Sequence, residues 1–232
     1  MTPLDLMRRR SAPLRLVIFD CDGVLVDSEP VSNRILAEEL TVLGWPMDTG
    51  EATRRFLGTT LRDMQPQIEA RIGAALPADW RQMVTIRIVA AMAEEAAAIP
   101  GAVEAVRAIT ALGVPWRVAS NSSHAEMQAK FGRIGLADLV GGRVHSHTDV
   151  IAGKPEPYLF LAAAAAEGVT PRDCVVVEDS VPGVRAAIAA GMDCLAFAPH
   201  SDGADLRALG AVPFHRMADL PSLVEAGWRQ SA

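Results

Sequence analysis

The chain has 232 residues, of which 50% are apolar and 22% are charged, and its formal net charge is −6. This composition excludes a disordered chain, and the acidic balance argues against a nucleic-acid partner, which would need a basic surface. The length fits one large domain, or a core domain that carries a smaller inserted one.

Cysteine usage and the first residues predict the cellular environment. Cys21, Cys174 and Cys194 are odd in number and lie in or beside apolar runs, which predicts buried thiols in a reducing compartment. The arginines at 8–10 are not followed by an apolar run of signal-peptide length, and no segment is long enough to span a bilayer. We therefore expect a frayed N-terminal segment and a cytoplasmic protein with no membrane partner.

The first predicted element is a strand at 16–19, whose sequence Leu-Val-Ile-Phe is apolar throughout. Such a run is typical of a strand that is buried on both faces in a parallel sheet. It ends on Asp20 and Asp22, and Gly23 then allows the chain to turn. Ligands bind beyond the carboxyl ends of strands in open parallel sheets, so the two aspartates stand where chemistry is expected.

The next seventy residues have apolar positions at helical spacing and contain no convincing strand. Helices are predicted at 31–43, 51–57, 61–72 and 78–98. This block is too long for a simple crossover between two strands. We therefore expect an inserted all-helical cap at 28–98, on a core formed by 1–27 and 99–232.

From residue 100 onward, helices alternate with short β-branched runs, which is the pattern of successive βαβ units. Helices are predicted at 103–112, 156–167 and 182–190. Strands are predicted at 116–120, near 143–146, at 174–177, at 194–197 and near 212–215. The expected fold class is α/β, with a doubly wound, Rossmann-like parallel-sheet core and the inserted helical cap.

Three later segments bring polar residues to the same edge of the predicted sheet. Ser120 and Asn121 end one strand, Glu178 and Asp179 follow another, and Lys154 stands in a loop before a helix. Each of these alone is more often turn chemistry or a surface residue. Their joint appearance in strand order predicts a site together with the two aspartates of the first strand.

Several acids and one lysine around a hydroxyl favour phosphoryl transfer. The carboxylates of Asp20 and Asp179, with Glu178 as a further candidate ligand, suit Mg²⁺, which prefers oxygen ligands. The metal and Lys154 would neutralise charge when a carboxylate attacks a phosphate dianion, and Ser120 with nearby amides would hold the remaining phosphate oxygens. A dinucleotide cofactor is disfavoured because no G-x-G-x-x-G follows the first strand.

These segments resemble the four motifs of the haloacid dehalogenase-like hydrolases, in the branch with a helical cap. The matching segments are DCDGVLVDSE at 20–29, Ser120, GKPEPYLF at 153–160 and VEDSVPGVRAA at 177–187. The resemblance implies that Asp20 is the nucleophile, forming an aspartyl-phosphate, and that Asp22 is the general acid and base. It also implies Mg²⁺ bound by Asp20, the backbone carbonyl of Asp22, and Asp179.

Within this family, a few positions separate the possible reactions. Asp22 argues against a dehalogenase, and the lack of any lysine between 27 and 98 argues against a phosphonatase. The chain resembles the sugar-phosphate phosphatases, and a hexose-phosphate mutase of the β-phosphoglucomutase type is the alternative. The mutases carry a His ten residues after the second Asp, where this chain has Ser32, and a cap Arg where it has Leu61. A non-catalytic binding module is disfavoured because all four motifs are intact.

The cap is expected to close over the site as a lid, with hinges near 26–29 and 98–101. Arg34, Arg62 and Thr59 are its candidates for contacts with a small phosphorylated metabolite, and Gly23 and Asn121 are those of the core. A solvated helix face remains an open explanation for both arginines. We expect a monomer or a weak dimer.

Overall fold

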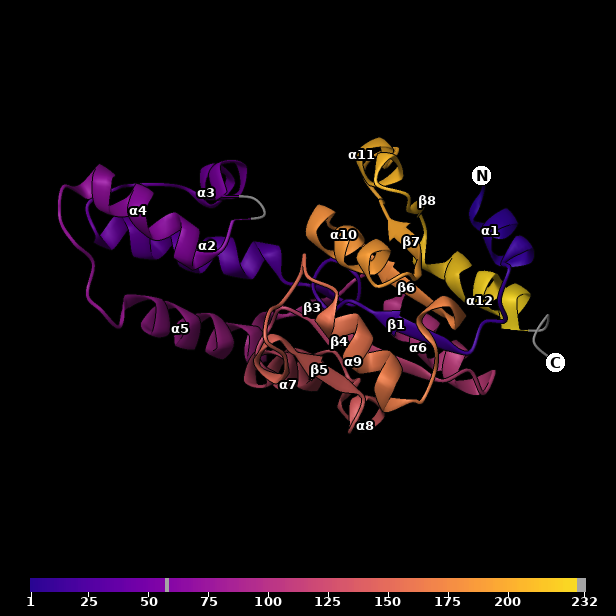
Figure 1. Cartoon of the computed structure of the whole chain (residues 1–232). Helices are drawn as coiled ribbons and strands as arrows, with labels where there is room; N and C mark the ends of the chain where they lie inside the picture. The colour runs from indigo at the N-terminus through magenta and orange to yellow at the C-terminus, as the bar shows by residue number, and fades with distance from the viewer. Residues whose placement is uncertain (57–58, 229–232) are drawn as a thin grey trace. The chain divides into compact units, whose positions relative to one another are not determined.

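The computed structural model describes residues 1–56 and 59–228, and the chain divides into two compact units (Figure 1). Unit 1 comprises Met1–Asp27 and Ala98–Ala232, and unit 2 comprises Ser28–Ala97. Leu57 and Gly58, at the predicted end of one helix and in the turn before the next, lie outside the described residues.

Unit 1 is built on a six-stranded parallel sheet with the strand order β5-β4-β1-β6-β7-β8. The strands are β1 Leu16–Phe19, β4 Trp116–Ser120, β5 Val144–Ser146, β6 Cys174–Glu178, β7 Asp193–Phe197 and β8 Val212–Phe214. The chain moves outward from β1 to β5 and then returns to β6 on the other side of β1, which confirms the doubly wound fold. The carboxyl ends of β1 and β6 therefore flank the point where the winding reverses, where open α/β sheets bind ligands.

Helices cover both faces of this sheet (Figure 1). They are α1 Pro3–Arg9, α6 Ala102–Ala111, α7 His124–Arg133, α8 Ala137–Val140, α9 Tyr158–Ala166, α10 Val181–Ala189, α11 Ala204–Ala208 and α12 Leu220–Trp228. Alternate side chains of β1 serve the two faces. Ile18 packs in a core cluster with Phe160 of α9 and Val184 of α10, whereas Phe19 meets Trp116 edge-on with ring centroids 6.1 Å apart. Every side chain of β1 is fully buried, as its apolar sequence predicts.

The N-terminal segment is helical at Pro3–Arg9, so the prediction that it is frayed is wrong. Thr2 and Asp5 form a reciprocal capping box, and Pro3 occupies the first turn of α1, where its missing N–H costs nothing. Leu6 and Met7 are buried, and α1 packs against α12. The cap and the two apolar side chains together stabilise a segment that is too short to be helical alone.

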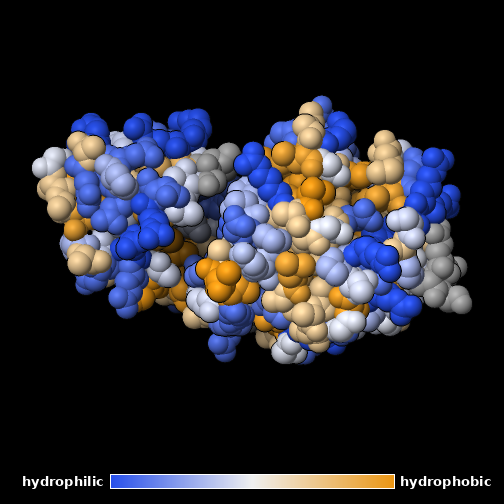
Figure 2. Space-filling view, in the orientation of Figure 1, coloured by the Kyte–Doolittle hydropathy of each residue, from blue (hydrophilic) through white to orange (hydrophobic). Residues whose placement is uncertain are grey.

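Unit 2 is helical, with α2 Glu29–Val42, α3 Thr49–Phe56, α4 Leu61–Ile72 and α5 Trp80–Glu95. Its own apolar cluster includes Leu40, Ile68 and Trp80. The surface of α2, α3 and α4 that faces the viewer in Figure 2 is mostly hydrophilic. These three helices therefore turn apolar side chains inward and a mostly polar face to solvent.

The last predicted helix of this block ends earlier than expected. Ala97–Ala98 form a short strand, β3, which pairs with β2 at Val26–Asp27, so the expectations of a helix to residue 98 and of no strand in this stretch are wrong. Alanine favours helices, which hid the strand in the sequence. Pro100 disfavours helical backbone at the residue before it, which helps the chain to become extended here.

All three cysteines are free and buried, as predicted. Among the described residues, no helix combines the length and the apolar character needed to cross a membrane.

Candidate active site

The end of β1 places Asp20 beside β6. The backbone N–H of Asp20 donates to the carbonyl of Val177 at 2.9 Å, which continues the ladder between the two strands. A Cβ at position 23 would collide with the Asp179 carboxylate. The φ of Gly23 is +76°, a left-handed conformation that favours glycine. Gly23, predicted to contact phosphate, thus has a packing role that lets Asp179 approach the turn after β1.

Glu178 is fully buried at the end of β6 and is saturated with hydrogen bonds. One carboxylate oxygen accepts from the backbone N–H of Asp179 and of Ser180, each at 2.8 Å, and from the Ser180 hydroxyl at 2.9 Å. The other oxygen accepts from Lys154 Nζ at 2.7 Å. Glu178 therefore ties the turn between β6 and α10 to the loop that carries Lys154.

Lys154 lies between two carboxylates in a nearly closed setting. Its side chain is 4% exposed, and Nζ donates to Asp20 Oδ1 at 2.5 Å as well as to Glu178. Asn121 binds both backbone polar groups of Lys154, since its Oδ1 accepts from the N–H at 2.8 Å and its Nδ2 donates to the carbonyl at 3.2 Å. Asn121, predicted to hold phosphate, is thus engaged in holding the loop of the lysine.

Ser120 stands at the end of β4 and is also buried. Its side-chain oxygen accepts from the N–H of Ser122 at 3.1 Å. The predicted site residues Asp20, Ser120, Lys154, Glu178 and Asp179 come from three strand ends and one loop, and all belong to unit 1.

When all of its carboxyls are ionised, this cluster carries more negative than positive charge, which protons or a bound cation can offset. Burial raises the pKa of Asp20 to about 7, although Lys154 opposes the rise. Burial and the neighbouring Glu178 carboxylate raise the pKa of Asp179 to about 9. Burial by itself would lower the pKa of Lys154, but the carboxylates of Asp20 and Glu178 outweigh it and raise that pKa. Three acids thus face one lysine in a setting of low dielectric constant.

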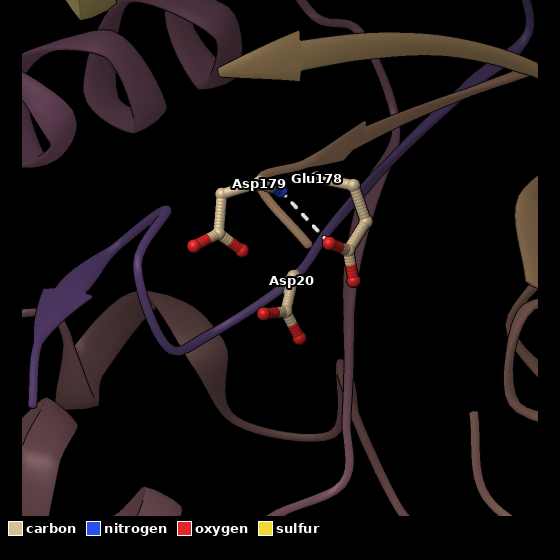
Figure 3. Close-up of side chains that lie close together, drawn as sticks. All are labelled: Asp20, Glu178 and Asp179. Atoms are coloured by element: carbon tan, nitrogen blue, oxygen red, sulfur yellow. Dashed lines mark hydrogen bonds between the residues drawn. The ribbon is translucent and has the colours of Figure 1, made fainter. Parts of the chain in front are cut away.

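The acidic cluster fits a hard divalent cation. Asp20, Glu178 and Asp179 each offer a carboxylate oxygen, and these oxygens lie within 4.8 Å of one another (Figure 3). Oxygen donors with excess negative charge are what Mg²⁺ prefers. Because the oxygens of Glu178 already accept four hydrogen bonds, Asp20 and Asp179 are better placed to bind such an ion directly.

Two further residues, Lys130 and Ser122, contact Asp22 and were not predicted from the sequence. Lys130 of α7 is 3% exposed and donates to Asp22 Oδ1 at 2.7 Å, and Ser122 Oγ donates to Asp22 Oδ2 at 2.8 Å. One signal was present in the sequence, because Lys130 shares the buried stripe of its helix with Met127 and Phe131. A lysine in an apolar stripe needs a buried partner.

The predicted cap residues all belong to unit 2. Arg34 pairs with Glu38 at 2.5 Å and with Glu95 at 2.6 Å, which joins α2 to α5 and favours the solvated-face explanation. Arg62 is exposed on α4, and Thr59 lines a cavity of about 210 Å³ within unit 2. Whether these three residues contact a substrate stays a prediction.

Known proteins match this chain along most of its length. A family model described as haloacid dehalogenase-like hydrolase matches residues 14–191. The 6-phosphogluconate phosphatase of Escherichia coli is 31% identical over 93% of this chain and 97% of that protein.

Solved structures agree with the family model. A HAD family hydrolase from Deinococcus radiodurans, with bound phosphate and sodium, is 34% identical with a TM-score of 0.77, over 94% of this chain and 98% of that one. A putative beta-phosphoglucomutase from Thermotoga maritima is 25% identical with a TM-score of 0.77, over 91% of this chain and 99% of that one. The strand order, the acidic edge of the sheet and these matches together confirm the predicted resemblance: this chain belongs to the haloacid dehalogenase-like hydrolases.

Proposed function

We propose that this protein is a Mg²⁺-dependent phosphatase that hydrolyses a small phosphorylated sugar or sugar acid through an aspartyl-phosphate on Asp20. The observation that carries the proposal is the buried Asp20 carboxylate, held by Lys154 at 2.5 Å beside the acidic cluster at the end of the sheet. The similarity to a 6-phosphogluconate phosphatase supports the substrate class. Unit 2 is proposed as the cap.

In the first step an Asp20 oxygen attacks phosphorus, and the bond between phosphorus and the leaving oxygen breaks as Asp22 gives that oxygen a proton. In the second step Asp22 takes a proton from water, whose oxygen attacks phosphorus and releases Asp20 and inorganic phosphate. Lys154 orients Asp20 and offsets negative charge, and Ser120 is proposed to bind a phosphate oxygen. Mg²⁺, held by Asp20, Asp179 and the Asp22 carbonyl, would stabilise the charge on the transferring phosphoryl group.

Metal binding is expected to strengthen as the pH rises. The pKa values of Asp20 and Asp179, raised to about 7 and about 9, mean that both carboxyls hold protons that a cation must displace. The affinity for Mg²⁺, measured by calorimetry, should therefore increase between about pH 6 and about pH 9 and be accompanied by proton release. Chelation should stop phosphate release.

One variant and its matched control test whether Asp179 binds the ion. Asp179→Asn should weaken Mg²⁺ binding strongly, whereas Asp205→Asn, an exposed aspartate of α11, should leave it unchanged. An affinity that does not vary with pH, or an Asp179→Asn variant that binds Mg²⁺ like the wild type, would show that this cluster is not the metal site.

A hexose-phosphate mutase is the second candidate, and the similarity to the Thermotoga protein favours it. A mutase must grip a second phosphate, which requires fixed cations. The described residues that line the unit 2 cavity include Ser32 and Leu61, and none of them is a lysine or an arginine. Arg62 is exposed on the same helix as Leu61. These observations support phosphate release over transfer.

Incubation with β-glucose 1-phosphate and a trace of the bisphosphate separates the two reactions. Free phosphate without accumulation of glucose 6-phosphate is expected. Stoichiometric glucose 6-phosphate with little free phosphate would contradict the phosphatase proposal.

A further inference from the structure

We infer that Lys130 and Ser122 form a clamp that positions the Asp22 carboxylate for proton transfer, an inference that rests on the proposed function. Each oxygen of Asp22 has its own donor in this clamp. Lys130 Nζ lies 2.7 Å from Oδ1, and Ser122 Oγ lies 2.8 Å from Oδ2. Lys130 also donates to Ser122 Oγ at 2.9 Å, so the three side chains form a closed network.

The clamp is anchored to the core of unit 1. Lys130 projects from the buried face of α7, and its side chain is 4% exposed. Ser122 is held through its backbone, because its N–H donates to Ser120 Oγ and its carbonyl accepts from Ser146 Oγ at 2.8 Å. The network therefore connects Asp22 to the ends of β4 and β5 and to α7.

The burial of Lys130 indicates that it acts on Asp22. An ammonium group in an apolar helix face is costly unless it is paired, and Met or Leu would fill the same space without that cost. Among the described residues, Asp22 is the carboxylate with which Lys130 forms an ion pair. The Asp22 side chain is itself 33% exposed. The two hydrogen bonds of the clamp fix the direction of this partly exposed carboxylate, and a proton donor displaced by about 1 Å can lose roughly 10²-fold in rate.

The test uses two substrates that differ in how much they need a proton donor. The leaving group of phenyl phosphate is a basic phenolate, whose departure benefits from protonation. The p-nitrophenolate of p-nitrophenyl phosphate leaves readily without a proton. In the presence of Mg²⁺, Lys130→Met should lower kcat/KM for phenyl phosphate by about tenfold or more, and that for p-nitrophenyl phosphate by less than about threefold. Ser122→Ala should show the same selectivity to a smaller degree. It also serves as the second variant if Lys130→Met does not fold, which circular dichroism would show.

A double-mutant cycle and a matched control complete the experiment. In an Asp22→Asn background, Lys130→Met should change kcat/KM for phenyl phosphate by less than about threefold, because the carboxylate that Lys130 positions is already absent. Arg10→Met removes another buried cation of unit 1, which pairs with Asp193 at the amino end of β7. It should leave the ratio between the two substrates unchanged.

Equal losses for both substrates, or a Lys130→Met effect of full size in the Asp22→Asn background, would overturn the clamp while leaving the phosphatase proposal intact. A folded wild-type protein that hydrolyses neither phosphate would overturn both.

Discussion

Replacing Asp20 by Asn is expected to reduce phosphate release by at least about 10³-fold, because an amide has nearly the same shape as a carboxylate but cannot attack phosphorus. Asp20 is 7% exposed and remains beside β6 through its backbone hydrogen bond, so the substitution removes the nucleophile without opening the fold. Phosphate release from p-nitrophenyl phosphate measures the effect.

A covalent intermediate can also be sought directly. Rapid acid quenching of the wild type with labelled substrate should trap label on the protein, and Asp20→Asn should trap none. Asp205→Asn, with the same change of charge on exposed α11, should resemble the wild type in both measurements. Activity of Asp20→Asn near that of the wild type would end the covalent proposal.

Lys154→Met is expected to lose both activity and stability. Nζ of Lys154 is paired with Asp20 and Glu178, and both carboxylates are largely or fully buried. Breaking a buried ion pair from one side leaves uncompensated charge, which typically costs about 3–5 kcal/mol in the free energy of unfolding. Turnover should fall by roughly 10² or more, because Lys154 no longer orients Asp20 or offsets the charge of the phosphate.

The loss of stability should grow with pH. Burial already raises the pKa of Asp20 to about 7 against the opposition of Lys154, so removing the lysine raises it further. A carboxyl whose pKa is higher in the folded state contributes stability at low pH that is lost as the pH rises through that pKa. Denaturant unfolding without metal should therefore show a larger difference from the wild type at about pH 8 than at about pH 5.

A second substitution separates the two losses. Lys154→Met combined with Glu178→Gln removes one of the stranded charges, and should recover stability but not turnover. If Lys154→Met alone unfolds like the wild type at about pH 8, the buried ion pair does not stabilise the fold as described.

Local signals in the sequence were sufficient for most of the core. The apolar run of β1 and the glycine that follows it predict a buried strand and a turn, because these depend on neighbouring residues alone. The order of strands also predicts that Asp20 and Lys154 meet, since parallel strands end at one edge of the sheet. The same local signals failed at Ala97–Ala98, where pairing with β2 overrides the preference of alanine for helices.

Only the tertiary structure decided which donor meets which acceptor at that edge. Lys130 and Asp22 are 108 residues apart, and although the apolar stripe around Lys130 indicates a buried partner, it does not indicate which one. The sequence placed Asn121 at a strand end, and only the folded loop shows that its side chain binds the backbone of Lys154. Propensity and periodicity act over a few residues and so determine which strands and helices form. The direction of a side chain, and the partner it reaches, depend on strand register and helix packing between distant parts of the chain.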